Sequence, residues 1–114
     1  MKTSDIVSSG TNNPLMNSKT FDPVSIPKEQ ITSLHFPKSD VLWSADEIAQ
    51  RKYDAQKGLL LGNDFKIKVR IIFEDAESTK QVETTIWGLT EEHLILKKGV
   101  VIPLHRIHSI IVCP

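Results

Sequence analysis

"FKIKVRIIFED", residues 65–75, alternates apolar with basic side chains and decides the expected fold. Apolar residues at every second position predict a strand with one face in the core and the other in solvent. After the polar turn DAES, the stretch QVETTIWGL, residues 81–89, alternates in the same way. A four-residue hairpin loop sets four pairs of residues opposite each other: Val69 and Thr84, Ile67 and Ile86, Arg70 and Glu83, and Lys66 and Trp87. Because one register suits both faces, we expect an antiparallel hairpin.

Three shorter strands are expected after this hairpin. Polar turns separate three apolar runs, which occupy residues 94–97, 100–104 and 108–113. Pro103 has no amide hydrogen to donate to a ladder, so it should mark the end of a strand or an edge. The sequence therefore predicts a mainly β domain with five antiparallel strands.

Residues 44–58, SADEIAQRKYDAQKG, carry the start and stop signals of a helix. Ser44 is the expected N-cap, and Glu47 at the third helical position completes a capping box. Gly58 is the expected end, because glycine readily adopts the left-handed conformation that terminates helices. The apolar face of this helix is weak, so we expect it to pack against a larger body.

The first 43 residues differ in composition from the rest and contain four of the six prolines. Residues 1–20 contain many Ser, Thr and Asn residues and few apolar ones, which predicts disorder. Residues 21–43 carry more apolar side chains than a linker needs. They are interpreted either as an extended arm lying on the folded domain or as a partner-binding segment. The expected division is thus an arm over residues 1–43 and a domain over residues 44–114.

The pattern KVRIIFED…VETTIWGLTEEHLILKKGVVIPLHRIHSI, following a helix, resembles the Sm-like barrel and the small bacterial YolD-like proteins. The resemblance covers residues 44–112 and implies a small five-stranded antiparallel barrel preceded by one α-helix. Sm-like proteins often form rings that bind RNA through loop residues. Their Asp and Asn in one turn and their Gly-rich turn are not matched here, where the chain has GLTEEH and PLHRIH. The resemblance therefore implies the barrel without its RNA pocket.

Composition argues against several classes of function. Lys plus Arg and Asp plus Glu number 14 each, so no overall charge attracts nucleic acid or an anionic membrane. The one cysteine, Cys113, has no partner for an internal disulfide, which suits a cytoplasmic location. No signal peptide and no run of 18 apolar residues is found, so no membrane association is expected.

His105 and His108 stand three residues apart with Arg106 between them. Zinc requires three or four ligands in a defined geometry, and no further His or Cys has the spacing of a ligand set. Ser109 is near both histidines, yet no acid is placed to orient a catalytic base. We therefore expect no metal, no cofactor and no enzymatic activity.

Apolar residues also fall on the outward side of the expected barrel. Ile72, Trp87 and Ile95 are the candidate partner-binding residues, and Val101 continues the set. A contiguous exposed apolar patch usually marks a contact surface. The 44–58 helix, the 21–43 arm or another subunit are the three candidates to cover it. The leading functional hypothesis is a binding or assembly module that contacts another protein or a second copy of itself.

The alternative hypothesis is single-stranded RNA or DNA binding through Lys66, Lys68 and Arg70. These three basic side chains share one strand face, with Trp87 expected beside them. Basic residues next to an aromatic ring bind phosphates and stack bases. The competing interpretation is a solvated face on which Glu83 neutralises Arg70, because a nucleic-acid footprint normally carries a basic excess.

Overall fold

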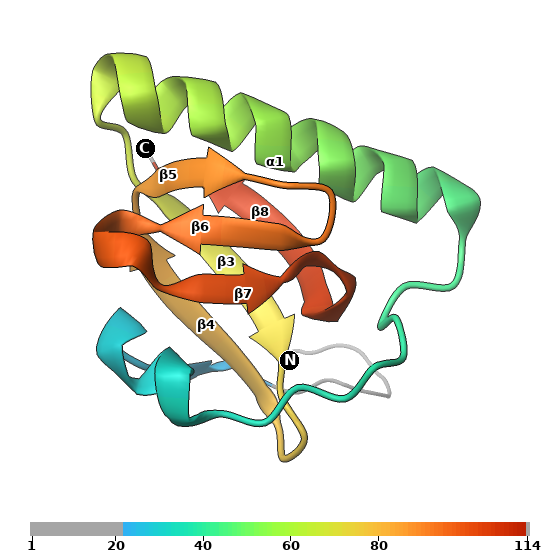
Figure 1. Ribbon diagram of the computed structural model, residues 1–114. Coiled ribbons are helices and arrows are strands. Elements are labelled where there is room, and N and C mark those ends of the chain that lie inside the picture. Colours follow the sequence, from blue (N-terminus) through green and yellow to red (C-terminus); the bar gives the residue numbers. More distant parts are fainter. Residues whose placement is uncertain (1–21, 114) are drawn as a thin grey trace, which may run out of the picture.

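The computed structural model describes residues 22–113, and the expected disorder of residues 1–20 falls outside that range. Strands dominate the described part, with a single α-helix along one side (Figure 1). The prediction of a mainly β domain preceded by a helix is therefore confirmed at this level.

The described strands form two sheets. The four-stranded sheet has the order β2-β4-β3-β8, with the bounds Val24–Ser25, Thr79–Thr84, Val69–Glu74 and Ile107–Val112. The three-stranded sheet has the order β5-β6-β7, with the bounds Ile86–Leu89, His93–Leu96 and Val101–Pro103. No strand pairing within residues 22–113 joins the two sheets, so the predicted closed barrel is wrong. Pro103 does end the edge strand β7, as its missing amide hydrogen requires.

The predicted hairpin is correct up to Thr84 and wrong beyond it. Val69 pairs with Thr84 and Arg70 with Glu83, as expected from the alternation. The chain then leaves the first sheet at Thr85, and Ile86 pairs with Leu96 of β6 instead of Ile67. The expected Lys66–Trp87 pair is absent for the same reason. This bend at residue 85 divides the strands into two sheets.

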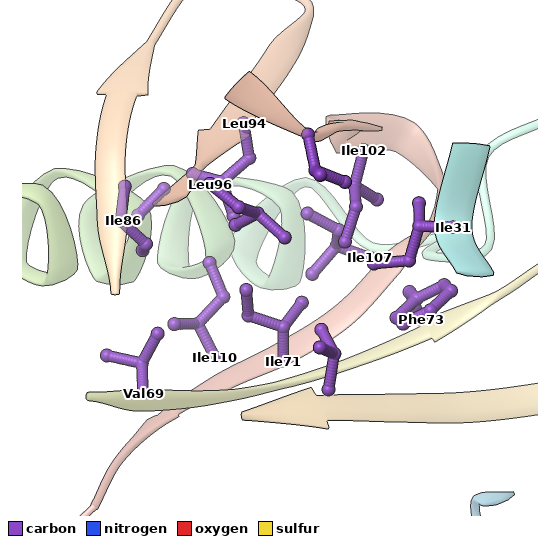
Figure 2. Packing of buried hydrophobic residues seen from close by; sticks show 13 residues of the cluster. Ile31, Val69, Ile71, Phe73, Ile86, Leu94, Leu96, Ile102, Ile107 and Ile110 are labelled. Carbon is purple, nitrogen blue, oxygen red and sulfur yellow. The ribbon is translucent and has the colours of Figure 1, made fainter. Parts of the chain in front are cut away.

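The hydrophobic core lies between the sheets (Figure 2). Leu94 and Leu96 point from the three-stranded sheet toward Ile71 and Ile110 of the four-stranded sheet. Alternation makes every second side chain of a strand face this core, so the intervening residues face away from it. The molecule therefore has two outward sheet faces on opposite sides.

Helix α1, Ala45–Phe65, is longer than predicted. Ser44 is its N-cap, and the Ser44 Oγ accepts hydrogen bonds from the amides of Asp46 and Glu47. The predicted end at Gly58 is wrong, because the helix continues to Phe65 and Lys66 takes the left-handed cap position with φ of 58°. Strand β3 consequently begins at Val69 rather than at Phe65.

Two glycines of α1 serve close packing instead of termination. A Cβ at Gly58 would lie 2.7 Å from the Ile86 Cδ1, and one at Gly62 would lie 2.5 Å from the Ile86 carbonyl oxygen. These residues share the buried side of α1 with Ala55. They allow the helix to contact both β5 and β8 and to cover the gap between the sheets on that side.

Residues 22–43 pack against the domain. The short 3-10 helix η1, Lys28–Ser33, contacts β4 and β7 and places Ile31 in the core at 2% exposure. Strand β2 adds to the edge of β4 in parallel. Residues 22–43 therefore lie on the folded domain, as an extended arm would.

Two buried arginines hold this arm. The Arg51 guanidinium donates to both carboxylate oxygens of Asp40 at 2.9 Å, and this hydrogen bond lowers the pKa of Asp40 more than burial raises it. Arg106 donates to the carbonyl oxygens of Ser39 and Glu74. Buried guanidinium groups need such partners, so both side chains have a structural role.

Candidate interaction surface

The outward face of the three-stranded sheet carries an exposed apolar row. Val101 is opposite Ile95, and Ile95 is opposite Gly88 in the register of the three strands. A β-bulge between Ile86 and Gly88 makes Trp87 the extra residue of β5. Because a bulge sets two residues against one, Trp87 lies beside Ile95 on this face. Trp87 is 51% exposed and Val101 is 41% exposed.

Neither of the two intramolecular elements expected to cover an apolar face covers this one. Helix α1 lies along the side where β5 and β8 approach each other, and η1 lies at the opposite side next to β4 and β7. In Figure 1 the sheet of β5, β6 and β7 is at the front, with no described element over it. We name Trp87, Ile95 and Val101 the apolar row.

Charged side chains of opposite sign flank the apolar row. Glu91 and Glu92 precede β6, and Lys97 and Lys98 follow it. All four residues are exposed, and within residues 22–113 none of them forms an ion pair. The middle strand of the sheet thus has an acidic end and a basic end.

Ile72 does not belong to this surface, although the sequence grouped it with Trp87 and Ile95. It lies in β3 between the buried Ile71 and Phe73, opposite Gln81 and Ser109. Its side chain therefore faces outward from the four-stranded sheet. The core separates it from the apolar row, so the single patch that was predicted is divided between opposite faces.

The structure also disperses the basic stripe of Lys66, Lys68 and Arg70. Lys66 caps α1 in the left-handed conformation, Lys68 precedes β3, and only Arg70 lies in the strand. Arg70 is opposite Glu83, as predicted. Trp87 is in the other sheet and cannot stack a base held by this stripe.

Lys66 and Lys68 do line a hollow of about 470 Å³ together with Glu83 and Cys113. The Cys113 thiol donates to the Glu83 carboxylate at 3.2 Å. Burial raises the pKa of the thiol, and the neighbouring carboxylate raises it further. The acid inside the hollow weakens its attraction for phosphate.

His105 and His108 take structural positions. The His105 Nε2 donates to the Pro37 carbonyl oxygen at 2.9 Å, and the His108 Nε2 donates to the Glu74 carboxylate at 2.9 Å. They therefore attach the arm and the end of β3 rather than converge on one point. In the described chain, no three His, Cys, Asp or Glu side chains are close enough together to bind a metal ion.

Further exposed apolar residues escaped the sequence analysis. Trp43 is 94% exposed immediately before α1, and Tyr53 and Leu60 lie on the solvent side of the helix. Their spacing of seven residues was a detectable signal for a shared helix face. Tyr53 and Leu60 are therefore exposed on one face of α1.

Searches against models of protein families, among curated proteins and among solved structures find no match to this chain. The resemblance to Sm-like proteins therefore stays a prediction. No helix within residues 22–113 combines the length and the apolar character that crossing a membrane requires.

Proposed function

We propose that this protein is a non-enzymatic contact module that binds protein through the outward face of its three-stranded sheet. One observation carries the proposal: Trp87 and Val101 are about half exposed and flank Ile95 on a face that the described chain leaves open. Aromatic residues surrounded by aliphatic side chains are typical of the anchoring residues of protein interfaces. The proposed partner-binding residues are therefore Trp87, Ile95 and Val101, and Ile72 is left out of the set.

Photo-crosslinking in cells tests this proposal. Trp87 is replaced by the photoreactive amino acid benzoylphenylalanine in the full-length chain, and Ile111 is replaced in the same way as the matched control. Ile111 is an exposed apolar residue on the outward face of the four-stranded sheet. We expect protein adducts from position 87 and few from position 111. Equal labelling at both positions, or none at 87, would overturn the proposal.

The alternative is single-stranded nucleic acid binding by Lys66, Lys68 and Arg70. It is supported by the exposure of all three residues and by the hollow that two of them line. It is opposed by Glu83, which faces Arg70 and lines the same hollow. We therefore rank it second.

Fluorescence anisotropy of labelled single-stranded RNA and DNA separates the two functions. Phosphate contacts release counterions, so binding through the stripe would weaken steeply as salt increases. At about 50 mM salt, phosphate contacts are strong, so a nucleic-acid binder would bind there. We expect no binding under this condition. Salt-sensitive binding that is lost in the Lys66→Ala, Lys68→Ala double variant would favour the alternative.

A further inference from the structure

We propose that the apolar row is covered by the same row of a second copy of this chain, in a two-fold symmetric dimer. This inference rests on the proposed function and names the partner. It follows from the arrangement of charge around the row, which fits a second copy better than a surface of a single charge.

The charges at the two ends of β6 have opposite signs. Glu91 and Glu92 stand at its beginning and Lys97 and Lys98 at its end, a separation of roughly 16 Å for five residues of extended chain. A two-fold axis can lie between the three-stranded sheets of the two copies and run perpendicular to β6. With this axis, β6 of the second copy runs in the opposite direction. Each acidic pair then lies over the basic pair of the partner, so the same attraction is formed twice.

Other arrangements do not satisfy these charges. An axis parallel to β6 would bring Glu91 and Glu92 against their own copies, which repel. A nucleic acid or an acidic peptide would fit Lys97 and Lys98 but meet repulsion at the other end of the strand. The chain has 14 basic and 14 acidic residues, so no net charge opposes association of two copies.

The centre of the face is suited to sheet-on-sheet packing. A Cβ at Gly88 would lie 3.2 Å from the Ile95 Cδ1, so the absence of a side chain there lets Ile95 lie against β5. Packed sheets lie about 10 Å apart, with the side chains of the two faces interdigitating. The apolar row of one copy, with Ile95 in the middle strand, then meets that of the other at the axis.

The dimer is isologous, so a charge reversal acts twice in every pair of chains. The variant E91K/E92K makes both ends of β6 basic, and the variant K97E/K98E makes both ends acidic. Each variant alone repels its own copies. A mixture of the two restores attraction at both ends, because one copy is basic where the other is acidic.

Sedimentation equilibrium of the full-length chain at low salt tests the inference. We expect the wild-type chain to dimerise, each variant to dimerise at least about tenfold more weakly, and their equimolar mixture to form a closed 1:1 dimer. The variant D64K/E77K is the matched control for E91K/E92K, since it changes the net charge by the same amount at two exposed positions away from the sheet face. It should dimerise like the wild-type chain, and unfolding curves of all variants should confirm that they fold.

Three results would overturn the dimer. They are a wild-type chain that stays monomeric, variants that dimerise as tightly as the wild-type chain, and a mixture that forms open chains longer than two copies. Adducts of position 87 with a different protein, together with a monomeric wild-type chain, would overturn the second copy and leave the proposed function intact. Absence of adducts at position 87 would instead remove the proposed function.

Discussion

The outward faces of the two sheets differ in how their polar groups are satisfied. On the four-stranded sheet, the Gln81 side-chain amide donates to the Ser25 hydroxyl at 2.6 Å. His108 on the same face donates to Glu74. These polar side chains have hydrogen-bond partners within the chain, as expected for a sheet face that is exposed to solvent.

The outward face of the three-stranded sheet has the opposite character. Its centre is the apolar row of Trp87, Ile95 and Val101, and its ends are charges without an ion-pair partner in the described chain. The outward face of the four-stranded sheet therefore carries polar contacts made within the chain, whereas the face of the three-stranded sheet carries an exposed tryptophan between charged ends. Substitutions should therefore separate the free energy of unfolding from the strength of association.

The largest effect on the free energy of unfolding is expected at Arg106, which links the arm to the end of β3. The variant Arg106→Met leaves the carbonyl oxygens of Ser39 and Glu74 without their donor. We expect the free energy of unfolding to fall by about 2–4 kcal/mol, measured by urea denaturation. A loss below about 1 kcal/mol would mean that this clamp is not structural.

Gly62 tests the close contact between α1 and β5, the strand that carries Trp87. A Cβ there meets the backbone oxygen of Ile86, which has no flexible end to move aside. Gly62→Ala should destabilise the chain by about 1–3 kcal/mol, despite the better helix propensity of alanine. Asn63→Ala places the same residue at the exposed next position and should change stability by less than about 0.5 kcal/mol. Equal effects would show that the contact is looser than described.

The pH dependence of stability tests the attachment of the arm. Arg51 lowers the pKa of Asp40 below its ordinary 3.8 in the folded chain. The ionised form is favoured by folding, so its stabilisation is complete above the ordinary pKa and is lost as the pH falls through the lower folded value. We expect Asp40→Asn to reduce stability at pH 7 and to flatten the loss of stability below pH 4 in denaturation curves. An unchanged acid profile would separate Asp40 from the arm's stability.

The smallest effect on stability is expected at Trp87, where the effect on association is large. Trp87→Thr keeps a strand-forming residue at an exposed position. The free energy of unfolding should therefore change by about 0.5 kcal/mol or less. Self-association should weaken at least about tenfold, because the dimer loses two aromatic anchors. Ile111→Thr on the other face is the control, and sedimentation should show its dimer unchanged. The reverse pattern would assign the contact to the four-stranded sheet.

Much of the fold could be predicted from local patterns. The alternation of Val69, Ile71 and Phe73 indicated the buried face of β3, and the register with Thr84 followed from it. The helix start at Ser44 followed from its side-chain chemistry. The helix end could not be predicted in this way. Gly58 is required by its close contact with Ile86, which is 28 residues later in the chain.

The candidate surface was predictable only in part. The alternation of side chains along each strand places Trp87 and Ile95 on the outward side. The predicted barrel has one continuous outer wall, so the sequence places Ile72 on the same surface. The bend at Thr85 divides that wall between two sheets, and no local signal marked it. The buried partners of Arg51 and Arg106 likewise come from distant segments and were not foreseen.

The most direct measurement is a concentration series of NMR spectra of the full-length chain, which follows the Trp87 indole and the methyl groups of Ile95, Val101, Ile72 and Ile111. We predict that the signals of Trp87, Ile95 and Val101 shift together as the dimer forms, while those of Ile72 and Ile111 stay in place. Shifts confined to Ile72 and Ile111, or no shift at any concentration, would contradict self-contact through the three-stranded sheet.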